Sequence, residues 1–158
     1  MTGSHDISRI AWDRDEDDLK VAQAFIMTMP AVPLVYYGDE IGMRYIEGMR
    51  SVEGAYIRTG SRTPMQWNDE KNHGFSTADK IYIPQDPKED APTVLKQEDD
   101  ENSLLNHLRN MAKLRKMHPA PSEDGDLKVT KTEYPAIYER SYGDENITVV
   151  LNPSARFY

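Results

Sequence analysis

The chain of 158 residues contains no cysteine. Disulfide frameworks and thiolate metal sites are therefore excluded. Positive charge is also scarce, because 27 acidic residues stand against 19 lysines and arginines, and the formal net charge is −8. A nucleic-acid binder needs a basic face, so this balance argues against a nucleic-acid partner and suits a neutral ligand.

The sequence also lacks an apolar run long enough to cross a membrane. The longest apolar stretch, residues 22–37, is interrupted by Gln23, Thr28, Pro30 and Pro33, whereas a spanning helix needs about 20 consecutive apolar residues. No secretory signal peptide is apparent. We therefore expect no membrane partner, and either a cytoplasmic protein or a chain whose true N-terminus is missing.

The first regular element that the sequence predicts is an amphipathic helix. Acidic residues at 15–18 fit the first turn of a helix, where carboxylates meet the positive end of the dipole. Apolar residues then follow at spacings of three and four from Leu19 to Met29, which places them on one buried face. Pro30 ends the pattern.

A short apolar run at residues 34–37 predicts a buried strand. The run is continuous rather than alternating and stops at Gly38, as in a strand of a parallel sheet covered on both faces. Asp39 and Glu40 follow directly. In barrels of alternating strands and helices the chemistry lies at this end of the strands, so both carboxylates are candidate site residues.

The long stretch at residues 42–97 shows little periodicity, and four prolines punctuate it. A stretch of this length without regular structure indicates a functional loop. Arg58, Arg62, Tyr56 and Trp67 lie within it. Guanidinium groups and flat aromatic faces suit a sugar site, although arginines paired with the surplus acid and a tryptophan in a core are the structural alternative.

The last third of the sequence predicts one helix and a sheet. Asn102 or Ser103 caps a helix whose apolar positions extend to Leu114, and Pro119 ends it. Three strands follow, at residues 127–130, 136–139 and 147–151. Three strands do not make a sandwich, so we expect this second unit to be the beginning of a larger β domain.

The histidines give a weaker signal. His5 beside Asp6 is a candidate pair, but such dipeptides are common. Adjacent residues cannot assemble a hydrolase triad with Ser4. His73, His107 and His118 are interpreted as structural, and no spacing of histidine and carboxylate side chains indicates a metal site. We expect neither a metal nor a cofactor.

Four segments in order resemble the α-amylase superfamily. The run TGSHDISR at 2–9 resembles the motif after barrel strand seven, and MPAVPLVYYGDEIGM at 29–43 looks like strand eight and its exit. The run SRTPMQWN at 61–68, followed by GFS, is similar to the oligo-1,6-glucosidase, α-glucosidase and trehalose synthase branch. The helix from Ser103 to Lys116 looks like the closing helix.

The resemblance implies roles for individual residues. Asp6 matches the third catalytic carboxylate, which stabilises the transition state, and His5 matches the histidine that hydrogen-bonds the sugar. Arg62 matches an arginine that contacts the non-reducing-end glucose. Asp39 and Glu40 would shape the site at the strand exit, below Asp6 in importance. Ser4 replaces an asparagine, and we expect this exchange to loosen the turn that holds His5.

The resemblance also implies what the chain does not contain. Retaining glycosidases need a nucleophile and an acid/base carboxyl about 5 Å apart, and nothing here matches the family's strands four and five, which carry them. We therefore expect the C-terminal part of a (β/α)8 TIM barrel, units seven and eight, at residues 1–119. Residues 120–158 would begin an antiparallel β-sandwich domain.

The implied activity is that of a retaining α-glycoside hydrolase or transglycosylase. Its partner would be an α-glucan or α-glucoside substrate such as maltose, isomaltose or malto-oligosaccharides. Alone, the chain is expected to be inactive and to self-associate or to need its missing N-terminal half. Two alternatives remain open: a trehalose synthase that isomerises maltose, and a non-catalytic carbohydrate- or partner-binding protein on the same fold.

Overall fold

A computed structural model describes residues 2–50 and 58–154. The chain divides into two compact units, and each is described by itself. The first unit comprises Met1–Glu16 and Val35–Asn106, and the second comprises Asp17–Leu34 and His107–Tyr158.

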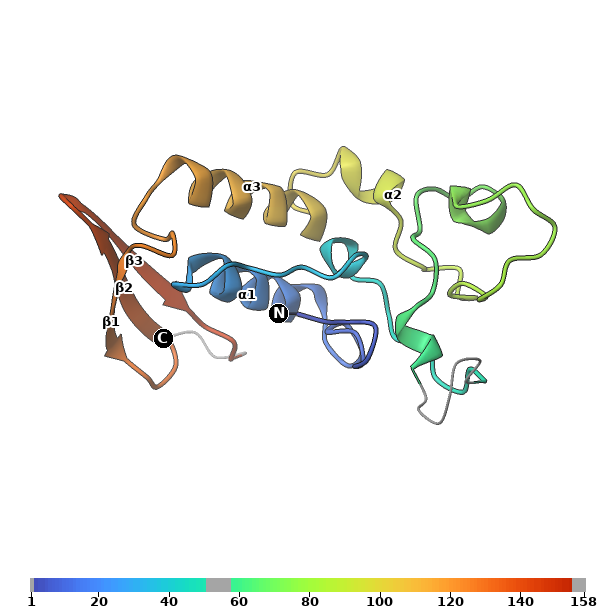
Figure 1. The fold of residues 1–158 in the computed structure, drawn as a ribbon, viewed down its shortest axis with the longest axis horizontal. Helices are drawn as coiled ribbons and strands as arrows, with labels where there is room; N and C mark the ends of the chain where they lie inside the picture. The colour runs from blue at the N-terminus through green and yellow to red at the C-terminus, as the bar shows by residue number, and fades with distance from the viewer. Residues whose placement is uncertain (1, 51–57, 155–158) are drawn as a thin grey trace. The chain divides into compact units, whose positions relative to one another are not determined.

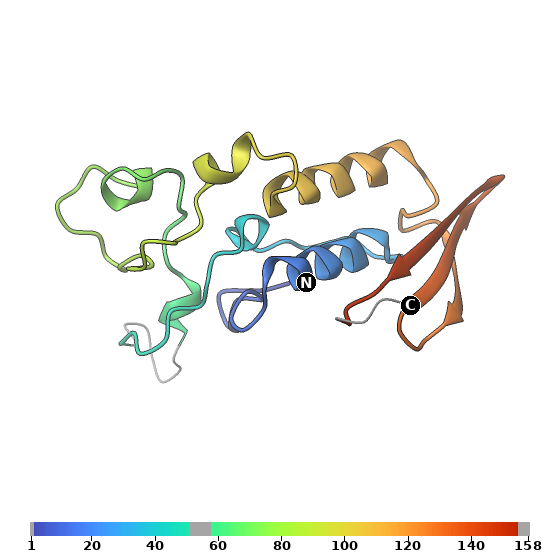
Figure 2. The same cartoon turned by 180° about the vertical axis from the view of Figure 1, so that it is seen from behind.

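Two helices supply most of the regular structure before the sheet. They are α1 (Glu16–Thr28) and α3 (Leu104–Met117), which run alongside each other in both views (Figures 1 and 2). His107 Nδ1 lies 2.9 Å from Gln23 Oε1 and joins them. Both helices lie where the sequence predicts them, and Ser103 Oγ accepts the Asn106 N–H at 3.2 Å as a cap. Among the described residues, no helix is both long and apolar enough to cross a membrane.

The second unit ends in an antiparallel sheet of order β1-β2-β3 (Figure 1). Its strands are β1 (Asp126–Lys131), β2 (Ala136–Tyr142) and β3 (Glu145–Leu151). Tyr138 is the register partner of Val129 on β1 and of Val149 on β3. The three predicted strands are confirmed, because alternating side chains and the turn at Gly143 fix the pairing.

Two arginines hold the second unit together through main-chain carbonyls. Arg140 is fully buried and donates to the carbonyl oxygens of Asp126 at 3.0 Å, Ser122 at 2.7 Å and Gly125 at 2.6 Å. Arg140 also donates to the Thr28 carbonyl at the end of α1. Arg115, on α3, in turn donates to the carbonyl oxygens that follow the last turn of α1, including Ala31 O at 2.6 Å. The bond to Thr28 satisfies a carbonyl that the end of α1 leaves without a partner.

The first unit is built from short elements around a small core. They are η1 (Asp39–Ile41), η2 (Thr59–Ser61), η3 (Lys71–Gly74) and α2 (Val94–Glu98). The core contains Ile41, Met43, Met65 and Leu105, with Val94 packed against it. The predicted long, irregular stretch is therefore confirmed, with short helices inside it.

The predicted buried strand at residues 34–37 is wrong for this chain. None of the described segments pairs with it, Leu34 is 58% exposed, and Tyr37 begins a turn. A strand exists only where a neighbour satisfies its N–H and C=O groups, and an apolar run alone does not supply that neighbour. Asp39 and Glu40 accordingly lie on η1 rather than directly after a strand.

Candidate functional site

Asp6 lies at the centre of a charged cluster in the first unit. Its Oδ1 accepts a hydrogen bond from Arg58 Nη1 and lies 3.4 Å from Arg62 Nη2. Its Oδ2 lies 3.3 Å from His5 Nε2. Arg62 Nε donates to the His5 carbonyl at 2.9 Å. The structure therefore brings together three of the predicted site residues, with Arg58 as a fourth member.

Local hydrogen bonds hold the turn that presents Asp6. The Ser4 hydroxyl accepts the Asp6 N–H at 3.1 Å, which is a side-chain turn of the kind that serine and asparagine both form. Serine at position 4 therefore closes a turn here, and a looser turn than with asparagine stays a prediction. Ser61 Oγ donates to the Ile7 carbonyl at 2.5 Å and ties η2, which precedes Arg62, to the same turn.

The cluster favours the ionised form of Asp6. Desolvation alone would raise its pKa, but the hydrogen bond from Arg58 and the charges of His5, Arg58 and Arg62 hold the pKa below its usual range. The carboxylate remains 47% exposed. An ionised carboxylate accepts several hydrogen bonds, so Asp6 can bind hydroxyl groups of a ligand while the arginines fix its orientation.

Asp39 has a different environment, in which it balances a buried cation. The Arg9 side chain is fully buried, and its guanidinium carbon lies 5.0 Å and 4.9 Å from the ring centres of Tyr36 and Tyr37. Arg9 Nη1 donates to Tyr37 O at 2.6 Å and lies 3.4 Å from Asp39 Oδ1. Burial raises the pKa of Asp39 above its usual range.

Asp39 also lies against the segment that leads to Asp6. A Cβ atom at Gly3 would come within 2.7 Å of Asp39 Oδ2, so a side chain at position 3 would displace the Asp39 carboxylate. Glu40 is half-buried, and burial raises its pKa. The two carboxylates that the sequence places at a strand exit thus lie next to the buried Arg9.

An apolar hollow lies beside Arg62. It has a volume of about 390 Å³ and is lined by residues that include Tyr37, Arg62, Met65, Phe75, Tyr82 and Ile83. Tyr37 is fixed there, since its hydroxyl donates to Thr63 O at 2.9 Å. Sequence reasoning missed this hollow, because its lining comes from positions far apart in an irregular segment and no periodicity marks them.

Trp67 belongs to another part of the loop. Its main-chain N–H donates to His73 O at 2.8 Å, and its main-chain carbonyl accepts the Leu95 N–H at 2.9 Å. The ring is half exposed and does not line the hollow beside Arg62. Tyr56, the other aromatic candidate, lies outside the described residues.

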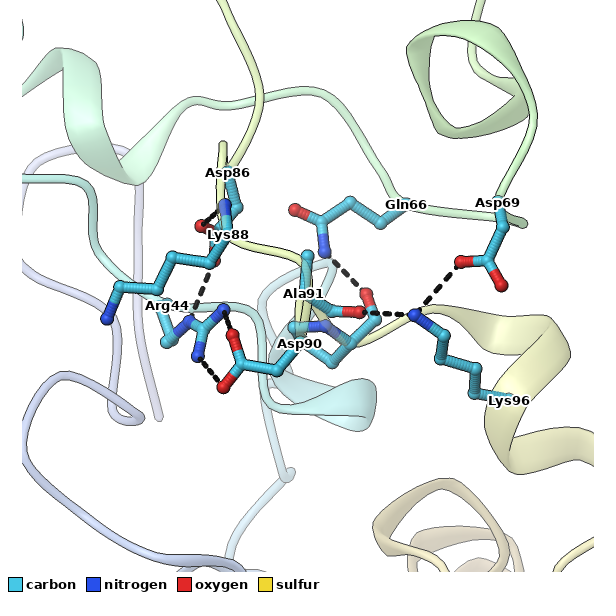
Figure 3. A network of polar contacts seen from close by, with 9 residues as sticks. Arg44, Gln66, Asp69, Asp86, Lys88, Asp90, Ala91 and Lys96 are labelled. Carbon is cyan, nitrogen blue, oxygen red and sulfur yellow. Dashed lines mark hydrogen bonds and ion pairs between the residues drawn. The ribbon is translucent and has the colours of Figure 1, made fainter.

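Charged side chains fix the loop beyond the hollow (Figure 3). Arg44 Nε donates to Asp86 Oδ2 at 2.7 Å, and the two terminal nitrogens of Arg44 donate to the oxygens of Asp90 at 3.1 Å and 2.9 Å. Lys96 lies 3.0 Å from Asp69 and donates to Ala91 O at 3.3 Å. In the described part of the chain, no three histidine or carboxylate side chains lie close enough to hold a metal ion.

Known proteins match both the sequence and the structure. The family model "Alpha amylase, catalytic domain" matches residues 1–124. The trehalose synthase/amylase TreS of Mycobacterium tuberculosis is 35% identical over 154 residues, which cover 92% of this chain and 25% of that protein. The oligo-1,6-glucosidase of Parageobacillus thermoglucosidasius is 29% identical and is matched over 89% of this chain and 30% of its own length.

Solved structures give the same result for the fold. The trehalulose synthase MutB, in its F164L mutant, superimposes with a TM-score of 0.84 at 24% identity over 98% of this chain and 34% of its own. The isomaltulose synthase PalI from Klebsiella sp. LX3 does so with a TM-score of 0.80 at 26% identity, over 94% and 33%. The chain thus spans about a quarter to a third of the proteins it matches. Because the family model covers most of the sequence, this chain belongs to the α-amylase family and matches the model of its catalytic domain.

Proposed function

We propose that this chain supplies part of the substrate site of a retaining α-glycoside hydrolase or transglycosylase. The substrates would be α-linked glucosides such as maltose, isomaltose or malto-oligosaccharides. The observation that carries the proposal is the Asp6 carboxylate, which is ionised, partly exposed and oriented by Arg58 and Arg62. Membership in the α-amylase family supports it.

Asp6 would act on the charge that develops during the reaction. Glycoside cleavage passes through a transition state with positive charge on the sugar ring. Hydrogen bonds from sugar hydroxyls to Asp6 become stronger as that charge grows, so they lower the barrier more than they stabilise the bound substrate. His5 and Arg62, which contact Asp6 or the backbone beside it, would keep the carboxylate aligned with those hydroxyls.

The proposal assigns no proton transfer to this chain. A retaining enzyme needs two further carboxyl groups, one as nucleophile and one as acid/base. None of the acidic segments here resembles the family segments that carry them. We therefore propose that the purified 158-residue chain does not turn over p-nitrophenyl α-glucoside or maltose, and turnover by rigorously purified chain would contradict this.

Isomerisation of maltose to trehalose is the second candidate. Similarity to the TreS protein over 92% of this chain favours it. Product analysis of the full-length protein that carries this segment distinguishes isomerisation from hydrolysis. Hydrolysis of maltose releases glucose alone, whereas the isomerase accumulates trehalose, and chromatography of the reaction mixture resolves the sugars.

The decisive experiment replaces Asp6 by asparagine in that full-length protein. We expect kcat to fall about 10²- to 10³-fold, as when one group that stabilises transition-state charge is removed. Circular dichroism should show an unchanged fold, since Asp6 is half exposed. Asp13→Asn is the matched control, because Asp13 is an exposed carboxylate that pairs with its neighbour Arg14. Wild-type kcat in Asp6→Asn would remove Asp6 from the mechanism.

A further inference from the structure

A second hollow in the first unit contains an exposed tryptophan. Its volume is about 400 Å³, within the range of small-molecule sites. None of the candidate site residues lines it. The residues that matter for recognition are Trp12, Arg44, Tyr45, Glu47, Asp86 and Lys88.

The Trp12 ring is exposed but held in place. It is 52% exposed, and both its polar edge and its ring have partners. Its Nε1 donates to Glu47 Oε1 at 2.8 Å. Its ring centre lies 5.4 Å from that of Tyr45, and the two planes are inclined by 45°. The indole therefore presents a preoriented apolar surface at the hollow.

The backbone below this aromatic pair is fixed as well. Ile46 N donates to Gly60 O at 3.2 Å. A Cβ atom at Gly60 would lie 2.2 Å from Ile46 O and 3.0 Å from the Tyr45 ring, so only glycine allows this approach. Arg44, which also lines the hollow, is held by Asp86 and Asp90 (Figure 3). A fixed site binds a ligand without a large cost of ordering its own side chains.

The charges around the hollow favour a neutral ligand. Two carboxylates neutralise Arg44, so its guanidinium does not present a pair of N–H donors to a phosphate or carboxylate group of a ligand. The remaining charged groups are Glu47 and Lys88, one of each sign, and both are exposed. Figure 3 shows the Lys88 side chain extending beyond the Arg44 network. One acceptor, one donor and a flat apolar face match a pyranose ring, which has an apolar face and an edge of hydroxyl groups.

We propose that this hollow is a second carbohydrate-binding site, separate from Asp6. A neutral glucose-type sugar stacks on Trp12, and its hydroxyl groups donate to Glu47 and accept from Lys88. Glu47 retains acceptor capacity beside its bond to Trp12, because a carboxylate accepts about four hydrogen bonds. The site does not depend on the function proposed above, and it would hold a saccharide whether or not Asp6 takes part in catalysis.

The test uses the intrinsic fluorescence of the chain. Only two tryptophans are present, so in Trp67→Phe the emission reports on Trp12 alone. Titration of this variant with maltose and maltotriose should give a saturable change in emission. Glycerol at equal hydroxyl concentration is the control for solvent effects. An emission that stays constant, or that responds equally to glycerol, would overturn the proposal.

Variants in the same background identify the site. Lys88→Ala should weaken binding about tenfold, because it removes one hydrogen bond with a charged group. Glu47→Ala should weaken binding at least as much, because it also removes the partner of Trp12 Nε1. Lys80→Ala, which removes an exposed lysine outside the hollow, should leave the affinity unchanged. Asp6→Asn should also leave the Trp12 signal unchanged. A signal that disappears in Asp6→Asn and persists in Lys88→Ala would place the sugar at the Asp6 cluster instead and refute the second site.

Discussion

The Arg58 guanidinium donates a hydrogen bond to Asp6 Oδ1, although the two residues are 52 positions apart in the sequence. Arg62 approaches the same oxygen at 3.4 Å, but its Nε donates to the main chain of His5. The two arginines thus have different tasks. Arg58 orients the carboxylate, and Arg62 also holds the backbone that carries it.

This difference predicts distinct kinetic effects in the full-length protein. Arg62→Ala should lower kcat/KM for short α-glucosides about tenfold or more, because it loosens the His5 backbone and removes a donor beside the substrate. Arg58→Ala should lower kcat with a smaller change in KM, because Asp6 loses its orientation. Steady-state kinetics on maltose measures both. Arg14→Ala, at an exposed arginine, is the control, and unchanged kcat/KM in Arg62→Ala would refute the recognition role.

The contact between His118 and Glu145 makes the stability of the second unit depend on pH. The hydrogen bond from the Ala120 N–H, and then that from His118, hold the pKa of Glu145 below its usual 4.5. A carboxyl group whose pKa is lowered by folding stabilises the folded state at any pH above its pKa in the unfolded chain. That stabilisation is lost as pH falls through its pKa in the folded protein.

Glu145→Gln should therefore destabilise the protein at about pH 7, and this effect should decline progressively as pH falls from 4.5 to about 3. Urea unfolding of the wild type and the variant at about pH 7 and about pH 3 measures the difference. Glu133→Gln, at an exposed carboxylate of the same unit, should show no such pH dependence. An equal destabilisation by Glu145→Gln at both pH values would indicate lost packing rather than a lost charge.

Gly125 is expected to tolerate no side chain. A Cβ atom there would lie 2.0 Å from the Ala120 carbonyl oxygen. Gly125→Ala should therefore lower the free energy of unfolding by about 2–4 kcal/mol, since backbone has to shift. Gly143→Ala is the control: its φ of +57° costs about 1 kcal/mol, but its Cβ meets open space. Thermal melting compares the two, and similar melting temperatures would contradict the steric argument.

The isolated chain is expected to self-associate. Phe25, Val32 and Leu34 are exposed large apolar residues in one short stretch of the second unit, and such patches promote association. Light scattering after size-exclusion chromatography should show a mass that rises with concentration, and Leu34→Ser should reduce it. A sharp monomer peak with a cooperative thermal transition would show that the chain is self-sufficient.

Local patterns predict the helices and the sheet well. The spacing of apolar residues and the Ser103 cap locate α3, and alternation around Gly143 locates β2 and β3. These signals lie within one element and need no knowledge of the rest of the chain. The run at residues 34–37 has an equally clear apolar pattern but forms no strand, because strand formation depends on a neighbour that the pattern does not reveal.

The candidate site also has one part that the sequence predicts and one part that it does not. The order of the family motifs singles out His5, Asp6 and Arg62, and the structure places these three side by side. The hollow with Tyr37 and the platform at Trp12 are absent from the sequence-based prediction. Each depends on packing between irregular segments tens of residues apart, for which a single sequence gives no periodic signal.

The converging carbonyls around Arg140 set a limit on how this chain can vary in length. Three of its acceptors, at Ser122, Gly125 and Asp126, belong to one connecting segment, and each must reach the same planar cation. Inserting or deleting a residue there would move several carbonyls out of register at once. The turn at Gly143 projects into open space and carries no such constraint. Among homologous chains, length differences should therefore collect between β2 and β3, while the connection between α3 and β1 keeps its length.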